Sequence, residues 1–137
     1  MEDKVTEDDI AEVRVRVQSF KDLMVWNQAM GLAKMCFLLT RSFPREELYG
    51  MTSQIRRASS SIPANIAEGS GRGSRKDYIQ FLRIAKGSAR ELETHLLLSA
   101  EVEITMREHI EPILRQLDSV SILLGRLIHA LEEPKQI

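Results

Sequence analysis

The stretch Ser74–Ser99, SRKDYIQFLRIAKGSARELETHLLLS, decides the fold class of this 137-residue chain. Its apolar residues recur every three or four positions, which is the spacing of one face of an α-helix. Ser74 followed by Asp77 is a capping-box pattern, so a helix is expected to begin there. The residues expected to face a core are Tyr78, Phe81, Leu82, Ala85, Ala89, Leu92, Leu96 and Ser99.

A helical pattern also runs from Phe20 to Phe43. Pro44 should end this helix, because proline disfavours the helical conformation in the residue before it. Its core face is expected to consist of Leu23, Trp26, Met30, Ala33 and Phe37, widened by Ala29, Leu32, Cys36 and Leu39.

The next helix is expected to begin near Arg45 or Glu46, where acidic residues suit the positive end of a helix dipole. Its apolar seam follows the steps of bundle packing: Leu48, Met51, Ile55, Ala58 and Ile62. Pro63 has no backbone N–H to donate, so we predict a kink or a break of the helix at that residue.

The last helical pattern follows Thr105 and Glu108, which form a second capping-box pattern. Its core positions would be Ile110, Ile113, Leu114, Leu117, Val120, Leu124, Leu127, Ile128 and Leu131. Together the four segments predict an all-α, antiparallel up-and-down four-helix bundle over residues 19–134. Residues 1–18 would form an acidic N-terminal tail or arm, in which Val13–Val17 alternates like a short strand.

Composition argues for a folded domain in water. Hydrophobic residues make up 43% and charged residues 28% of the chain, which argues against intrinsic disorder. The apolar runs are far shorter than the roughly 20 residues that span a bilayer, and the single Cys36 excludes an internal disulfide framework. We therefore expect a cytoplasmic protein without membrane contact. Its apolar residues outside one seam predict self-association.

Charge is segregated along the chain, although the net value is only −1. Residues 1–12 carry −5, residues 13–55 carry +3, residues 56–90 carry +6 and residues 91–137 carry −5. The basic segment therefore stands apart from the acids at both ends of the chain.

Eight cations of this basic segment are predicted to bind nucleic acid. They are Arg56, Arg57, Arg72, Arg75, Lys76, Arg83, Lys86 and Arg90. Lys76, Arg83 and Arg90 are seven residues apart, so they form one ridge about 21 Å long. Such a ridge can follow the phosphates of RNA or DNA with weak sequence specificity. The alternative is a solvated helix face with local ion pairs.

The sequence contains no pattern typical of an active site. Gly69–Gly73 lacks the pattern of a phosphate-binding loop, and Ser59–Ser61 lacks that of a nucleophile. Glu91 and His95 lie one helical turn apart, but the paired motifs of di-iron bundles are absent. We therefore predict no catalysis, no metal and no cofactor, and a buried, inert thiol at Cys36.

Several longer motifs resemble one bacterial family. They are Ser19–Gln28 (SFKDLMVWNQ), Phe43–Gly50 (FPREELYG), Gln54–Ala58 (QIRRA), Ser61–Gly69 (SIPANIAEG), Gly71-Arg72 and Gly87–Glu93 (GSARELE). Through these motifs, roughly residues 18–100 resemble the four-helix bundle proteins encoded in intervening sequences of large-subunit ribosomal RNA genes. That family is similar in turn to the accessory variability protein of diversity-generating retroelements.

The resemblance implies a homopentamer with a basic surface, and a relative that binds nucleic acid and a reverse transcriptase. Basic positions of the family are matched by Arg56, Arg57, Arg72 and Lys76, and its signature by Pro63, Asn65, Glu68 and Gly69. Asn65 and Glu68 are expected to satisfy backbone groups freed at Pro63, with Arg57 or Arg72 as the partner of Glu68. Two acidic segments, residues 1–18 and Glu101–Ile104, depart from the family pattern.

These observations predict a non-enzymatic homo-oligomer that binds nucleic-acid backbone. By the resemblance it would be a pentamer, with a reverse transcriptase as a candidate protein partner. The alternative is a protein–protein interaction scaffold that binds no nucleic acid.

Overall fold

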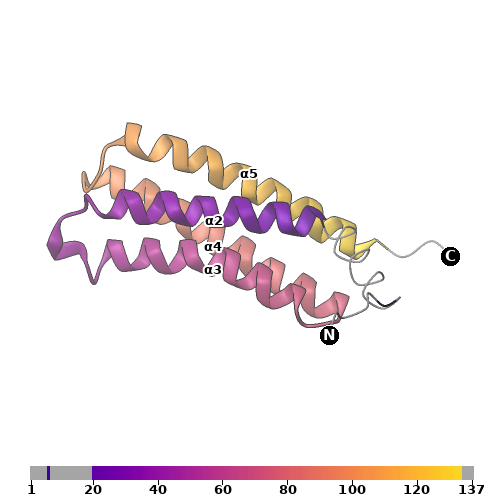
Figure 1. Cartoon of the computed structure of the whole chain (residues 1–137). Helices are drawn as coiled ribbons and strands as arrows, with labels where there is room; N and C mark the ends of the chain where they lie inside the picture. Colours follow the sequence, from indigo (N-terminus) through magenta and orange to yellow (C-terminus); the bar gives the residue numbers. More distant parts are fainter. Residues whose placement is uncertain (1–5, 7–19, 134–137) are drawn as a thin grey trace.

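The computed structural model describes Thr6 and residues 20–133. In that part the chain forms helices α2 (Phe20–Thr40), α3 (Met51–Ser70), α4 (Arg75–Glu101) and α5 (Arg107–Glu132) and no strand (Figure 1). A short 3-10 helix, η1 (Arg45–Glu47), precedes α3. The all-α four-helix prediction is confirmed. The tail predicted at residues 1–18, with its strand at Val13–Val17, lies outside the described residues except for Thr6.

Each long helix packs against two others, as in a bundle. Helices α2 and α4 both contact α3 and α5, so they lie on opposite corners. The short connections at residues 71–74 and 102–106 make successive helices antiparallel (Figure 1). Among the described helices, none is long and apolar enough to cross a membrane.

The faces predicted for α4 and α5 do form the core. On α4, the buried residues are Leu82, Ala85, Ala89, Leu92, Leu96 and Ser99. On α5, they are Ile110, Ile113, Leu117, Val120, Leu124, Leu127 and Ile128. Each large side chain buried in this way contributes about 1.5–3 kcal/mol to folding.

The face predicted for α2 is right only in part. Of its buried residues, Ala29, Leu32, Ala33 and Cys36 were predicted, whereas Val25 was not. Met30 and Phe37 were expected in the core, but they are 46% and 40% exposed. Because α2 carries apolar residues on almost every side, its sequence does not specify which side turns inward.

Two of the predicted helix starts are also wrong. Residues 45–47 form η1, and α3 begins only at Met51, after Gly50 with non-helical backbone angles. The Met51 N–H donates to the Glu47 carboxylate (3.2 Å), which caps α3 from outside the helix. Helix α5 begins after Met106 and not at a Thr105 cap. At α4 the prediction is confirmed, since the Asp77 N–H donates to Ser74 Oγ at 3.1 Å.

Helix α3 continues through Pro63 without a break, and the predicted kink is not confirmed. Because the helix is not broken at Pro63, Asn65 does not cap a helix end there. Its Nδ2 donates to the carbonyl oxygen of Ser61 (2.8 Å) and to Ser61 Oγ (2.9 Å). Ser61 Oγ is hydrogen-bonded in turn to Ser88 Oγ of α4 (2.9 Å). Asn65 therefore links the two helices through Ser61.

Gly69 lets the end of α3 approach α4. A Cβ atom at Gly69 would stand 2.7 Å from Cβ of Phe81 and 3.0 Å from Cδ1 of Tyr78. Real Cβ atoms do not come that close, so α3 and α4 could not keep this separation with any larger residue.

Candidate nucleic-acid interface

The predicted cations of α4 lie along one side of the helix. Arg75, Lys76, Arg83 and Arg90 are exposed, and Lys86 is half-buried. The Lys86 amino nitrogen lies 3.7 Å from the point where a Cβ of Gly125 would stand, so Lys86 reaches across to α5. The ridge predicted from the seven-residue spacing therefore borders the junction of α4 and α5.

Three of the eight predicted cations are paired with acids. Arg57 contacts Glu91 at 2.8 Å, Arg72 contacts Glu68 at 2.6 Å, and Arg83 pairs with Glu132 of α5. Exposed pairs of this kind are worth about 0–1 kcal/mol, so a phosphate can displace the acid. The pairing nevertheless reduces the local positive charge available to a polyanion.

Arg56 is held between α2 and α3. Its Nε donates to Thr40 Oγ1 at 2.9 Å, and its guanidinium carbon lies 5.1 Å from the centre of the Phe37 ring. Arg72 stacks similarly on Phe81 at 4.9 Å. These contacts hold both guanidinium groups against the bundle.

The remaining four cations, Arg75, Lys76, Lys86 and Arg90, form what we call the α4 stripe. None of the four makes an ion pair with another residue in the described part of the chain. The stripe runs from Arg75 to Arg90, which is 15 steps along the helix, or about 22 Å at 1.5 Å per residue. Arg57, Arg72 and Arg83 are each paired with a described acid, whereas these four cations are not.

A hollow of about 540 Å³ lies at the N-terminal end of the stripe. It is lined by Arg75, Lys76, Gln80 and Arg83 from α4, by Leu131 and Glu132 from α5 and by Glu133, which follows α5. Acids therefore reduce the positive potential at this end of the stripe.

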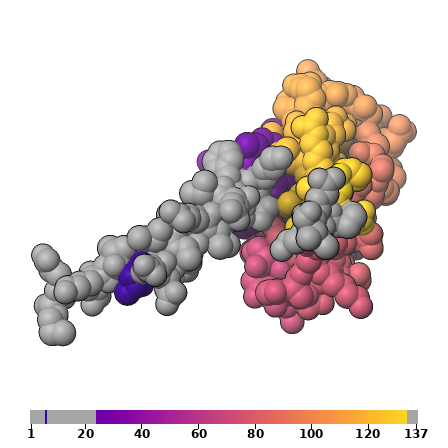
Figure 2. Space-filling model, turned by 90° about the vertical axis from the view of Figure 1, so that its right-hand side faces the viewer, coloured from indigo at the N-terminus to yellow at the C-terminus, as the bar shows by residue number. Residues whose placement is uncertain are grey.

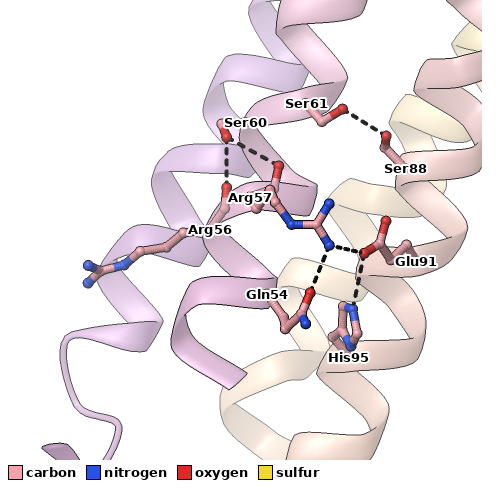
Figure 3. Close-up of polar contacts among 8 residues, drawn as sticks. All are labelled: Gln54, Arg56, Arg57, Ser60, Ser61, Ser88, Glu91 and His95. Carbon is pink, nitrogen blue, oxygen red and sulfur yellow. Dashed lines mark hydrogen bonds and ion pairs between the residues drawn. The ribbon is translucent and has the colours of Figure 1, made fainter. Parts of the chain in front are cut away.

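A polar seam joins α3 to α4 on the other side (Figure 3). Arg57 donates to Gln54 Oε1 and Glu91 Oε1, each at 2.8 Å, and His95 Nε2 lies 3.4 Å from the same Glu91 oxygen. The carboxylate of Glu91 is thus already occupied. Within the described residues, no three His, Cys, Asp or Glu side chains gather where a metal ion could be held.

Cys36 is buried in the core, as predicted. Burial raises the pKa of its thiol from 9.0 to about 12, and a hydrogen bond with Ser59 lowers it only in part. At neutral pH the thiol is protonated and shielded from reagents.

The signature residues have structural roles. Pro63, Asn65 and Gly69 shape α3 and its contacts, and Glu68 pairs with Arg72, one of its two expected partners. Glu68 is half exposed, however, with 52% of its side chain accessible.

Sequence reasoning missed a hydrophobic groove between α2 and α3. It is lined by Trp26, Met30, Ala33, Lys34 and Phe37 of α2 and by Ser60, Pro63, Ala64 and Ala67 of α3, and its volume is about 430 Å³. We call it the α2/α3 groove. The small residues Ser60, Ala64 and Ala67, spaced four and three apart outside the seam, were the available signal.

Two comparisons with known proteins gave matches. The family model described as 23S rRNA-intervening sequence protein matches residues 21–126. A crystal structure from Bacteroides thetaiotaomicron, of a protein with unknown function from the S23 ribosomal protein family, matches with 32% identity and a TM-score of 0.73. The match covers 80% of this chain and 98% of that one. A comparison with curated proteins found no match.

Proposed function

The chain belongs to the 23S rRNA-intervening sequence protein family, and from that premise we propose that it is a non-enzymatic binding protein of the cytoplasm. It forms a homo-oligomer and holds the phosphate backbone of RNA or DNA on the α4 stripe. The observation that carries the proposal is the stripe itself, with four cations on one helix side and no described acid paired to them.

The geometry of the stripe suits the phosphate backbone of a nucleic acid better than the edges of its bases. Phosphates of one strand lie about 3.4 Å apart along the duplex axis, so a stripe of about 22 Å lies alongside roughly six of them. Phosphate contacts position a protein on a duplex without reading its sequence. Binding is therefore salt-dependent and weakly sequence-specific.

Self-association through the α2/α3 groove is part of the proposal. The groove exposes Met30 and Phe37, and burying such apolar surface against another copy is favourable. If copies form a closed ring, as the pentamer of the resembling family would, the stripe repeats around that ring. Several weak contacts then act together on one polyanion.

A protein scaffold that binds no nucleic acid is the second candidate, with a reverse transcriptase as one partner to test. The α2/α3 groove favours it, because the groove offers a hydrophobic surface to a partner helix. Recovery of a partner protein after nuclease treatment, with no measurable affinity for nucleic acid, would favour this scaffold over the proposal.

Salt titration tests the proposal. The full chain is mixed with 20-base-pair duplex RNA, duplex DNA and a single strand of the same length, and affinity is measured at increasing salt. We expect the logarithm of affinity to fall with the logarithm of salt, by about 0.9 per phosphate contact on B-DNA. Weak binding that does not change with salt would overturn the proposal.

A further inference from the structure

We propose that the acidic segment Glu2–Glu12 of this chain binds the α4 stripe of the same chain and competes there with nucleic acid. Only the competition depends on the proposed function. Docking of the segment is a contact within the chain and can be tested without any nucleic acid.

The two surfaces are complementary in charge. Residues 1–12 contain six acids and one lysine, for a net charge of −5. The α4 stripe offers four cations without a described ion-pair partner. Glu132 of α5 already pairs with Arg83, which lies between Lys76 and Lys86 along α4, so this side of the helix can hold a carboxylate.

The topology brings the segment to the correct end of the bundle. Met24 of α2 lines the same cavity as Leu127 and Ala130 of α5, and one turn earlier α2 begins at Phe20. Leu131–Glu133 in turn line the hollow beside Arg75 and Lys76. Figure 2 looks onto this end, where the last turn of α5 (yellow) lies near the α3–α4 connection (pink).

The distance is within reach. Helices α2 and α4 occupy opposite corners, so their axes are about 14 Å apart if neighbours pack at roughly 10 Å. Glu12 precedes Phe20 by eight residues, and eight residues can bridge at most about 26–29 Å, which exceeds this separation. Because the segment is tethered within reach of the stripe, its effective concentration there is on the order of millimolar.

The α2/α3 groove is a poorer place for the segment. The groove is lined almost entirely by apolar side chains, with Lys34 as its one cation, whereas half of residues 1–12 are acids. Moving those carboxylates into an apolar surface would be unfavourable without partners. The stripe keeps them solvated and paired.

Carbodiimide crosslinking of the full chain tests the docking, because it joins a carboxylate to a lysine that it touches. The lysines report separate surfaces: Lys76 and Lys86 mark the stripe, and Lys34 marks the groove. We expect peptides containing Glu7, Asp8, Asp9 or Glu12 to be linked to Lys76 or Lys86, and the links to fade at high salt. Links to Lys34 alone, or none to the stripe, would overturn the proposal. In a mixture of ordinary and ¹⁵N-labelled chains, we expect no link between an ordinary and a labelled peptide. Such links would place the segment on a neighbouring copy and overturn docking within the chain.

Competition is measured with a variant that neutralises Glu7, Asp8, Asp9 and Glu12 to Gln or Asn. At about 50 mM salt we expect it to bind duplex RNA about two- to tenfold tighter than the unchanged chain, the range that a millimolar effective concentration gives against a weak contact. The matched control neutralises Glu46, Glu101, Glu103 and Glu108, which lie at the opposite end. An equal gain in RNA affinity in both variants would mean that net charge alone causes the gain, and it would overturn the competition. If no form binds RNA, the proposed function and the competition fail together, while the crosslinks still decide the docking.

Discussion

At the scale of the residue, Gly69 permits the close contact between α3 and α4. Replacing it by Ala would place a Cβ 2.7 Å from Cβ of Phe81, and overpacking of this kind costs about 1–3 kcal/mol. We expect Gly69→Ala to lower the urea midpoint accordingly. Gly87 is the matched control, because nothing lies within 4 Å of its Cβ position. Gly87→Ala should stabilise by about 0.5–1 kcal/mol through helix propensity; similar destabilisation of both variants would contradict this role of Gly69.

Cys36 gives a prediction about pH. Its pKa is raised to about 12 by burial, against 9.0 for the free group. Between these values the unfolded thiol releases its proton and the folded one keeps it, so stability falls as pH rises. The loss is about 1 kcal/mol per pH unit in that window. The measurement is the difference in unfolding free energy between the unchanged chain and Cys36→Ala at pH 8 to 10.5. A difference that stays constant with pH would contradict a buried, protonated thiol.

At the scale of the element, sequence specified some helix faces and not others. The faces of α4 and α5 could be predicted because their apolar and polar residues are well separated. The face of α2 could be predicted only in part, since residues on several of its sides are apolar and its neighbours decide which are buried. The start of α3 depends on the Glu47 side chain reaching Met51 from outside the helix, which no local capping pattern indicates.

For the candidate site too, the sequence predicts one part, and only the packing of the helices decides the other. Sequence placed the cations of α4 on one ridge, but it could not say which of the eight predicted cations are paired. Two of the acid partners come from other helices: Glu91 is 34 residues from Arg57, and Glu132 is 49 residues from Arg83. The free α4 stripe therefore emerges only from the packing of helices.

The ion pair between Arg57 and Glu91 allows a test at this scale. Glu91→Gln releases Arg57 from its carboxylate partner, and an exposed pair contributes at most about 1 kcal/mol to stability. We expect nearly unchanged stability but tighter binding to duplex RNA, with a salt slope steeper by about one contact. Glu93→Gln removes the same charge from the same helix without releasing an ion pair in the described structure. Identical slopes in both variants would show that Arg57 does not reach phosphate.

At the scale of the whole molecule, the α2/α3 groove is expected to join copies of the chain. Met30→Glu places a charge in that groove, so we expect sedimentation analysis to show a smaller assembly. Ile122→Glu is the control, because Ile122 is similarly exposed (48% against 46%) but lies on α5, away from the groove. Dissociation caused by Ile122→Glu and not by Met30→Glu would place the contact elsewhere.

The charge of the whole molecule is nearly balanced, yet four cations without an ion pair in the described part of the chain lie along one side of α4. Phosphate binding by these four cations is best tested by the salt dependence of duplex DNA binding for a variant with Arg75, Lys76, Lys86 and Arg90 all replaced by Gln. Its control replaces Arg41, Arg45, Arg115 and Arg126, which lie outside the stripe and carry the same total charge. We expect the salt slope to be reduced by about 3–4 per chain in the stripe variant and by less than about 1 in the control. Equal slopes in the two variants would rule out phosphate binding by the stripe.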